Sequence, residues 1–407
     1  MTSFQESALS ACAEMRALFP ATPLQKNEYL SGLYGTDIYL KREDLSPVRS
    51  YKIRGAFNAM RKALANGEGQ QFVCASAGNH AQGVAFACAH FGVKGRIYMP
   101  VTTPQQKIGK TAAFGGQSIE IILQGDYFDE TLAAATEYAT AHGAHMLPPF
   151  DDLDVIEGQA SVGVEILEQL GEAPDMIVTP VGGGGLSAGL VQFFAGHDVD
   201  FRFCEPSGGR SLFAAINAGQ LVTLDTVDNF VDGAAVARIG DNNFKALKNQ
   251  NPDHVLGIPE GRICGTISEM LNIEGIVLEP AGALAVDALK DLRAEIQGKK
   301  IVCIASGGNF DFERLPDIKE RALRYEGLKK YFILRMPQRP GALKDFLNLL
   351  GPNDDIARFE YLKKSARNFG SVLLGIESNS SAGFDDLCAR MTDNGFHFED
   401  ITNDDVL

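Results

Sequence analysis

Apolar and polar positions follow two alternating patterns along the first 310 residues. Short apolar runs, such as 71–75, 95–99 and 176–180, are typical of buried strands. Between them lie longer segments with apolar residues at helical spacing, such as 52–66 and 127–142. Strands that alternate with helices predict an α/β fold with a parallel sheet covered on both faces. Ligands of such sheets bind beyond the carboxyl ends of the strands.

The alternation forms two series. The first ends near residue 145, and the second begins after the loop-forming segment 148–152, which reads PPFDD. Strands are expected again at 201–205 and 301–305. We therefore expect two interleaved lobes with a cleft between them, the small lobe spanning about residues 50–145 and inserted in the large lobe.

The pattern changes after the charged segment 311–330. The expected order is strand, helix, strand, strand, helix, strand, which is that of an α+β ferredoxin-like domain. The strands fall at 331–336, 356–362, 371–377 and 396–401, and the helices at 340–350 and 382–391. This segment holds no evident nucleophile, base or metal cluster, which favours a regulatory or assembly module. We place a catalytic domain at 1–325 and this second domain at 326–407.

Composition narrows the possible partners and compartment. The 407 residues include 37 basic and 52 acidic side chains, a formal charge of −15, which disfavours nucleic acid as a partner. The seven cysteines are scattered without a Cys-x-x-Cys pair, which indicates reduced thiols rather than disulfides or a metal site. The N-terminal residues do not resemble a targeting peptide, and no apolar run approaches the ~20 residues of a membrane span. We expect a cytoplasmic protein without a membrane partner.

The first candidate for chemistry is Lys52, in a stretch of residues 50–56 that reads SYKIRGA. With Ser50 as the helix cap, Lys52 falls in the first turn of a helix. The helix N-terminus disfavours a second positive charge, but this does not apply to a neutral amine or a Schiff base. The structural alternative is a solvated lysine at a loop–helix junction.

The second candidate is the glycine run of residues 182–185, which follows an apolar strand and precedes a helix. Backbone N–H groups of consecutive glycines converge, and the helix dipole adds attraction for an anion. The run is neither a Walker loop nor a dinucleotide-binding fingerprint. A flexible linker is the alternative, and the strand directly before the run disfavours it. A Schiff-base lysine together with a phosphate cradle indicates pyridoxal phosphate.

Six stretches in this order resemble the β-family (fold type II) of pyridoxal-phosphate enzymes. More closely, they resemble the threonine dehydratases (threonine ammonia-lyases) of the short biosynthetic form with one C-terminal ACT-like domain. The stretches are KREDL at 41–45, SYKIRGA at 50–56, SAGNHAQG at 76–83, GGGGL at 182–186, EPAG at 279–282 and SGGN at 306–309. The resemblance covers nearly the whole chain and implies a two-lobed, tryptophan-synthase-β-like catalytic domain.

The resemblance also implies roles for individual residues. Lys52 would hold the cofactor as a Schiff base and remove the Cα proton, which requires a pKa below the ordinary ~10.4. Tyr51 would lie against the cofactor ring, Asn79 would hydrogen-bond its 3′ oxygen, and Ser306 would face the pyridine nitrogen, where a hydroxyl favours elimination. The phosphate would be held by Gly182, Gly183, Gly184, Gly185 and Leu186, and the substrate carboxylate by Ser76, Ala77, Gly78, Asn79 and His80.

The implied reaction is β-elimination of L-threonine to 2-oxobutanoate and ammonia, the first committed step of isoleucine biosynthesis. The ACT-like domain implies inhibition by isoleucine, with valine as an activator, at a site between paired domains of a homotetramer or dimer. No metal is expected. A catabolic L-serine/L-threonine dehydratase is an alternative within the same family.

The fold also leaves open a serine racemase, a cysteine-synthase-like enzyme and an amino-acid sensor without activity. Racemases of this family need an acid–base serine where this chain has Ala77, and an acidic metal ligand where it has Ser211. Cysteine-synthase-like enzymes carry Lys-Asp-Arg where this chain has residues 52–54, Lys-Ile-Arg. The intact lysine and cradle disfavour a sensor.

Several residues of these motifs have local structural interpretations as well. Asn79 and His80 are both placed to cap the helix that follows them, because Asn is a preferred cap. Glu279 is placed to cap the next helix, and Asp232 to form a turn. Sequence alone does not separate these roles from a part in the site.

Overall fold

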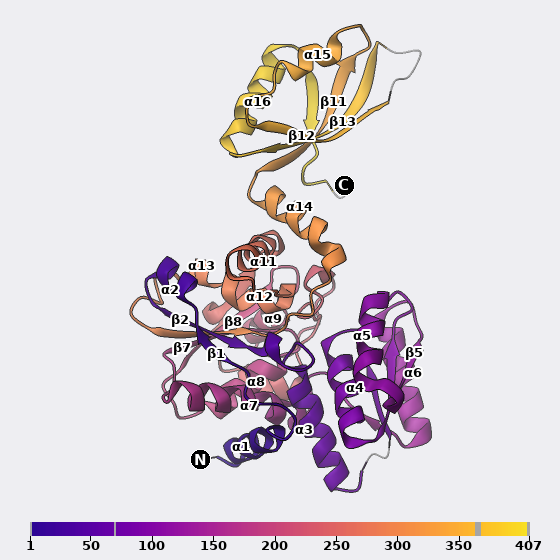
Figure 1. The fold of residues 1–407 in the computed structure, drawn as a ribbon, viewed down its shortest axis with the longest axis vertical. Coiled ribbons are helices and arrows are strands. Elements are labelled where there is room, and N and C mark those ends of the chain that lie inside the picture. The colour runs from indigo at the N-terminus through magenta and orange to yellow at the C-terminus, as the bar shows by residue number, and fades with distance from the viewer. Residues whose placement is uncertain (1, 69–70, 363–367, 405–407) are drawn as a thin grey trace. The chain divides into compact units, whose positions relative to one another are not determined.

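The computed structural model describes residues 2–68, 71–362 and 368–404 (Figure 1). Contacts divide the chain into two compact units, residues 1–311 and 312–407. Helix α14 (Leu315–Tyr325) therefore belongs to the second unit, whereas the sequence-based limit at 325/326 places it in the first. The limits of the functional domains stay a prediction.

A six-stranded sheet forms the large lobe of the first unit. Its order is β1-β2-β10-β7-β8-β9, and every neighbouring pair except β1–β2 is parallel. Burial on both faces explains why these strands read as continuous apolar runs. The strands are β1 (Leu24–Lys26), β2 (Asp37–Arg42), β7 (Met176–Pro180), β8 (Asp200–Pro206), β9 (Val255–Ile258) and β10 (Lys300–Ala305).

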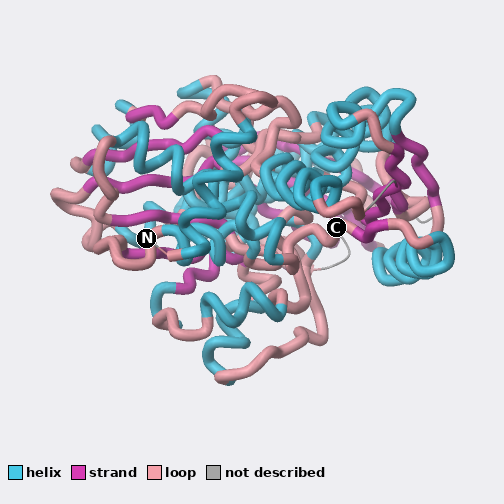
Figure 2. Tube along the Cα trace, turned by 90° about the horizontal axis from the view of Figure 1, so that it is seen from below, coloured by secondary structure: helices cyan, strands magenta, loops and turns pink. Residues whose placement is uncertain are grey.

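Helices cover both faces of this sheet, as the alternation predicted (Figure 2). Val302 and Ile304, alternate residues of β10, join a core cluster with α1 (Ser3–Met15), α7 (Leu153–Leu170) and α8 (Gly185–Phe193). The other face packs against α12 (Pro280–Asp287), which in turn contacts α11 (Glu260–Glu274). The remaining helices of this lobe are α2 (Glu28–Tyr34), α9 (Ser211–Ala218), α10 (Asp241–Leu247) and α13 (Leu289–Leu292).

A second parallel sheet, of order β5-β4-β3-β6, forms the small lobe. Its strands lie between residues 71 and 146, and thus between β2 and β7 of the six-stranded sheet along the chain. They are β3 (Gln71–Ala75), β4 (Lys94–Met99), β5 (Ile119–Leu123) and β6 (His145–Met146), with helices α4 (Asn79–Phe91), α5 (Gln105–Gly115) and α6 (Phe128–His142).

Helix α3 (Lys52–Ala65) packs against both lobes through small residues. A Cβ atom on Gly158 of α7 would lie 2.4 Å from the carbonyl oxygen of Arg54, so the two helix backbones are in close contact. On the other side, a Cβ on Gly83 of α4 would lie 3.1 Å from the carbonyl oxygen of Lys52. Glycine is therefore required for α3 to reach this position, and the position fixes Lys52 at the junction of the lobes.

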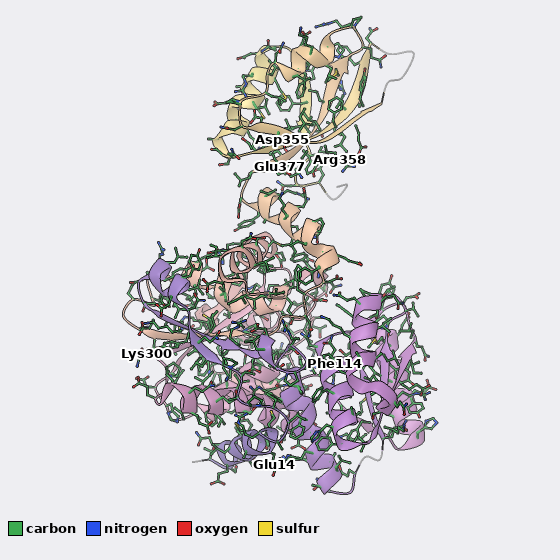
Figure 3. All side chains as sticks on the ribbon, in the orientation of Figure 1. Glu14, Phe114, Lys300, Asp355, Arg358 and Glu377 are labelled. Atoms are coloured by element: carbon green, nitrogen blue, oxygen red, sulfur yellow. The ribbon has the colours of Figure 1, made fainter. Side chains whose placement is uncertain are left out.

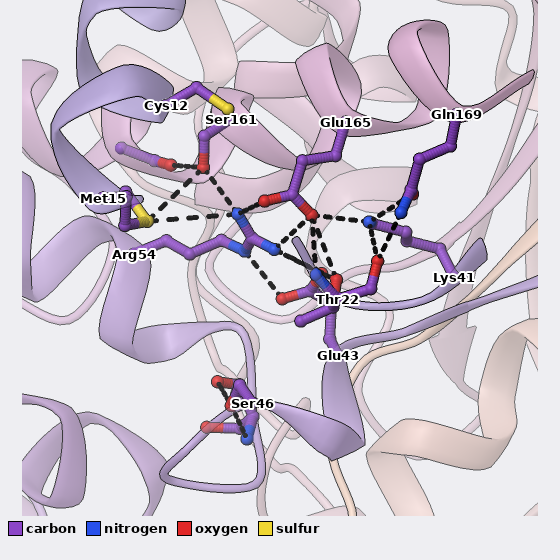
Figure 4. Close-up of polar contacts among 12 residues, drawn as sticks. Cys12, Met15, Thr22, Lys41, Glu43, Ser46, Arg54, Ser161, Glu165 and Gln169 are labelled. Carbon is purple, nitrogen blue, oxygen red and sulfur yellow. Dashed lines mark hydrogen bonds and ion pairs between the residues drawn. The ribbon is translucent and has the colours of Figure 1, made fainter. Parts of the chain in front are cut away.

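A buried ionic cluster lies between α3, α7 and the end of β2 (Figure 4). Arg54 donates to Glu43 at 2.7 Å and to Glu165 at 2.8 Å, and Lys41 donates to Glu165 at 2.5 Å; all four side chains are fully buried. Burial alone would raise the pKa of Glu165, but Arg54 and Lys41 outweigh it and hold that pKa well below its usual range. The cluster ties α3 to α7 and to the segment after β2.

The second unit has the βαββαβ order that the sequence predicts. Its antiparallel sheet has the order β12-β13-β11-β14 and packs one face against the helices through residues such as Phe332, Leu374 and Phe384. Asp355 and Glu377, labelled in Figure 3, are cross-strand partners on neighbouring strands. The elements are β11 (Lys329–Pro337), α15 (Ala342–Leu347), β12 (Asp354–Leu362), β13 (Phe369–Ser378), α16 (Ala382–Asp393) and β14 (His397–Asp400).

The structure also describes the cysteines and the apolar character of the helices. All seven cysteines are free thiols, and all but Cys388 are buried. Among the described residues, no helix combines the length and the apolar character that a membrane crossing requires.

Candidate active site

Three candidate segments meet at the carboxyl ends of adjacent strands. The order β2-β10-β7 places the loop before Lys52, the loop that begins at Ser306 and the glycine run side by side. Backbone hydrogen bonds tie the first two loops together, from Tyr51 N to the carbonyl oxygen of Ser306 (3.2 Å) and from Gly308 N to that of Arg49 (2.9 Å). The segments that the sequence singled out separately therefore form one site.

Lys52 is the first residue of α3, as expected, but Ser50 does not cap the helix. The residue before the helix is Tyr51, whose side chain makes no capping bond, and Ser50 Oγ is buried without a hydrogen-bond partner among the described residues. Ser50 instead pairs with Gly307 in an isolated bridge, which holds its backbone extended. The capping prediction was wrong because this tertiary contact competes with the local one.

The amine of Lys52 lies among apolar groups. Its Nζ donates to the carbonyl oxygen of Pro149 at 2.8 Å and lies 5.3 Å from the ring centroid of Tyr51 and 5.9 Å from that of Phe150. Desolvation lowers the pKa of Lys52 to about 8, although the charge of Glu279 acts in the opposite direction. A substantial neutral fraction near physiological pH suits a lysine that acts as a nucleophile or a base.

The glycine run is the turn between β7 and α8. Gly184 has φ = +91°, and a Cβ on Gly183 would lie 2.3 Å from the ring of Phe150. Asn243 Nδ2 donates to the carbonyl oxygen of Gly183 at 2.7 Å, which fixes that peptide. Within the described part of the chain, the backbone N–H groups from Gly183 to Leu186 have no acceptor, although these residues are buried. Buried N–H groups without partners at a helix N-terminus are the feature of an anion site.

The loop between β3 and α4 carries Ser76, Ala77 and Gly78, which are all partly exposed, and Ser76 Oγ accepts a bond from Gly78 N at 3.2 Å. His80 is buried, with Nε2 3.0 Å from the carbonyl oxygen of Leu147. Burial, and after it the charge of Lys52, lower the pKa of His80 to about 3, so the ring is neutral. The close contact of Gly83 with the backbone of Lys52 places the start of α4 beside that lysine.

Asn79 is not a helix cap either. Its Nδ2 donates to Glu279 Oε1 at 2.6 Å, and its Oδ1 accepts from Asn309 Nδ2 at 2.7 Å. Ser306 is buried, and its Oγ donates weakly to the carbonyl oxygen of Ala281 at 3.3 Å. Asn79 and Ser306 thus both lie beside α12, on the same side of the site.

Sequence reasoning assigned no role in the site to three of its members: Phe150, Glu279 and Asn309. Phe150 packs behind Gly183 and also lies near Lys52, so it connects the glycine run to the lysine. Glu279 is buried; burial, and then the charge of Asp232, raise its pKa to about 7. Glu279 and Asn309 stand in the EPAG and SGGN stretches, which is the signal that marked them.

These residues fit pyridoxal phosphate. The orphaned amides of Gly183 to Leu186 suit its phosphate, the desolvated amine of Lys52 suits its aldehyde, and the hydroxyl of Ser306 suits a neutral ring nitrogen. No cluster of three or more His, Cys, Asp or Glu side chains in the described residues is arranged to hold a metal ion.

Comparison with known proteins agrees with this geometry. Residues 16–307 match the family described as pyridoxal-phosphate dependent enzyme, and residues 320–407 match the C-terminal regulatory domain of threonine dehydratase. The chain is 46% identical over 389 residues to "L-threonine dehydratase biosynthetic IlvA" of Bacillus subtilis (strain 168), covering 95% of this chain and 92% of that protein. The chain belongs to the threonine dehydratase family. Its use of pyridoxal phosphate and its fold type II architecture, both expected from the sequence, are thereby confirmed.

Solved structures place this threonine dehydratase family member within a wider group. The processed form of threonine deaminase isoform 2 from Solanum lycopersicum is 35% identical, with a TM-score of 0.73 over 79% of this chain and 94% of that one. Maize serine racemase is 26% identical, with a TM-score of 0.70 over 79% of this chain and 98% of that one. The fold is therefore shared by dehydratases and racemases, and the reaction has to be argued from the site.

Proposed function

We propose that this chain eliminates water from L-threonine and releases ammonia to give 2-oxobutanoate, as the first committed step of isoleucine biosynthesis. The desolvated amine of Lys52, placed beside orphaned backbone amides at the start of α8, is the observation that carries the proposal. The names of its relatives support the choice of substrate.

The cofactor, when bound, supplies an electron-withdrawing ring that stabilises negative charge at the substrate's α-carbon. Lys52 Nζ would hold the cofactor covalently and then accept the α-proton, for which a pKa of about 8 is well suited. Ser306 would place a neutral hydroxyl at the ring nitrogen, so less charge enters the ring and departure of the β-hydroxyl is favoured.

The remaining site residues would bind and orient. Backbone amides of Gly182, Gly183, Gly184, Gly185 and Leu186 would bind the phosphate through the α8 dipole. Tyr51 would pack against the ring and Asn79 would donate to its 3′ oxygen. The loop of Ser76, Ala77, Gly78, Asn79 and His80 would bind the substrate carboxylate, since the first turn of α4 has free N–H groups.

Racemisation is disfavoured by two positions. Ala77 offers no exchangeable proton where racemases of this family carry an acid–base serine. The carboxylate of Glu205, near the expected racemase metal site, already accepts from the amides of Leu212 (2.7 Å) and Phe213 (3.0 Å), and Ser211 supplies no carboxylate. A catabolic serine/threonine dehydratase remains the second candidate because the same residues would act on L-serine.

For the second unit we propose an effector role: isoleucine inhibits, valine relieves the inhibition, and the site lies between paired domains of a dimer or tetramer. The βαββαβ unit with its match to a threonine dehydratase regulatory domain supports this. A biosynthetic role in turn favours a cytoplasmic location.

The deciding experiment measures 2-oxo acid formation from L-threonine and L-serine, each with and without isoleucine. We expect threonine turnover that isoleucine suppresses. Equal serine turnover without an isoleucine response would favour the catabolic enzyme. Release of D-amino acid with no keto acid would overturn the dehydratase assignment.

A further inference from the structure

Glu279 is a buried carboxylate beside the site whose side chain serves no structural purpose in its own helix. It precedes α12 but makes no side-chain capping bond there, and it is only 8% exposed. Its backbone N donates to the carbonyl oxygen of Gly307 at 3.2 Å, and a Cβ on Gly307 would lie 2.0 Å from Glu279 Oε1. The carboxylate of Glu279 therefore lies between the loop after β10 and the side-chain amide of Asn79, in contact with both.

A directed chain of hydrogen bonds passes through Asn79. Lys110 Nζ donates to Asn309 Oδ1 (3.3 Å), Asn309 Nδ2 donates to Asn79 Oδ1 (2.7 Å), and Asn79 Nδ2 donates to Glu279 Oε1 (2.6 Å). An ammonium group can only donate and a backbone carbonyl oxygen can only accept, so Lys110 at Oδ1 and Val48 at Nδ2 set the orientation of Asn309, which in turn sets that of Asn79. Asn309 Nδ2 also donates to the carbonyl oxygen of Val48 (2.8 Å), which fixes the orientation of Asn309 independently.

This direction leaves Asn79 with one unused group. An asparagine amide has one oxygen and two N–H bonds. The oxygen is engaged by Asn309 and one N–H by Glu279, so the second N–H of Nδ2 is the group left for a ligand. With the amide reversed, an oxygen would face the ligand, and it would repel the 3′ oxygen of the cofactor.

We propose that Glu279 is a positioning residue: it holds the amide of Asn79 so that an N–H, and not the oxygen, faces the 3′ oxygen of the bound cofactor. The inference rests on the proposed role of Asn79. The acceptor function does not require the charge, because a glutamine at 279 would present an amide oxygen to Asn79 Nδ2. Among the described residues, the charged groups that interact with this carboxylate include Asp232, Lys107, Lys110 and Lys52.

The test compares Glu279→Leu, which removes the acceptor, with Glu279→Gln, which keeps it. Each is measured by titrating cofactor-free enzyme with pyridoxal phosphate and by recording the visible absorbance of the bound cofactor. Glu279→Leu should weaken cofactor binding about ten- to hundredfold and shift the absorbance band, while Glu279→Gln should stay within about threefold of wild type. Wild-type affinity and absorbance in Glu279→Leu, or equal damage in both variants, would overturn the proposal.

A second variant and a matched control guard against misfolding. Asn309→Ala removes the donor to Asn79 Oδ1 but keeps Glu279, so it should shift the absorbance band less than Glu279→Leu does; a shift as large as that of Glu279→Leu would contradict the proposal. Asn27 Nδ2 donates to Glu274 at 2.7 Å away from the site, so Glu274→Leu breaks a similar pair and should leave cofactor affinity unchanged.

Asn79→Ala separates the inference from the function on which it rests. If Asn79→Ala binds the cofactor as tightly as wild type with the same absorbance, the proposed role of Asn79 is wrong. If Asn79→Ala is impaired and Glu279→Leu is not, only the positioning role of Glu279 is wrong.

Discussion

Nζ of Lys52 donates a hydrogen bond to the carbonyl oxygen of Pro149 at 2.8 Å, and among the described residues this is its one hydrogen-bond acceptor. Lys41, which is fully buried, instead donates to the carbonyl oxygen of Thr22, to Glu165 and to Gln169, which uses all three of its N–H bonds. The two lysines thus differ in their hydrogen bonding. The amine of Lys41 is fully hydrogen-bonded within the ionic cluster, whereas the amine of Lys52 is available for chemistry. We expect only Lys52 to react with the cofactor.

Gly183→Ala tests the glycine run as a phosphate cradle. The added methyl group would lie 2.3 Å from the ring of Phe150, so the loop has to move and the amides lose their alignment. Overpacking of this kind costs ~1–3 kcal/mol, and we expect cofactor affinity to fall at least about tenfold in a direct titration. Gly109→Ala, where the methyl group meets nothing within 4 Å, is the control and should bind as wild type. Equal affinity of the two variants would contradict the cradle.

Arg54→Met tests the buried ionic cluster. The substitution leaves Glu43 and Glu165 buried with too little positive charge, which costs ~3–5 kcal/mol. We expect a clear fall in the thermal midpoint, measured by scanning calorimetry. Arg238→Met breaks an exposed pair with Asp241 and should cost ~1 kcal/mol or less. A thermal midpoint for Arg54→Met as high as that of Arg238→Met would show that the cluster does not stabilise the fold.

The lowered pKa of His80 should make the stability of the folded chain depend on pH. Its pKa falls from the ordinary 6.5 to about 3 in the folded chain, so the neutral ring contributes stability above pH 6.5 that is lost as the pH falls toward 3. Wild type should therefore lose stability relative to His80→Gln by ~1.4 kcal/mol per pH unit below about pH 6. Thermal midpoints of both proteins from pH 7 to pH 4 measure this. Parallel curves would mean that His80 is not held neutral.

Removal of the second unit tests the regulatory proposal. Residues 1–311 form a compact unit of their own. A chain that ends at Asp311 should therefore keep its threonine turnover. We expect this chain to lose its response to isoleucine, measured as initial rates over a range of isoleucine concentrations beside the full-length enzyme. Unchanged inhibition would move the effector site into the first unit.

Local sequence signals predicted most of the fold and singled out the segments that the fold brings together in the candidate site. The glycine run, Lys52 and the βαββαβ unit are each encoded within a short stretch, by conformational freedom, helix position and periodicity. Their convergence at one sheet edge follows from parallel topology, which the alternation of strands and helices already implied.

The hydrogen-bond partners of the site's side chains could not be predicted from the sequence, because they lie far away along the chain. Asn79 and Glu279 are 200 residues apart, and Asn79 and Asn309 are 230 apart. Local propensity favoured capping for Asn79 and Glu279, but tertiary hydrogen bonds took both side chains instead. Ser50 failed as a cap for a similar reason, since its pairing with Gly307 depends on the closed fold.

The most direct test of the central claim is to identify the lysine that holds the cofactor. The holoenzyme is treated with borohydride, digested, and its peptides are analysed by mass spectrometry. The structure predicts the pyridoxyl phosphate mass on Lys52, with none on Lys41, and no labelled peptide from Lys52→Arg. A label on any other lysine, or a Lys52→Arg variant that still forms 2-oxobutanoate at the wild-type rate, would contradict the account.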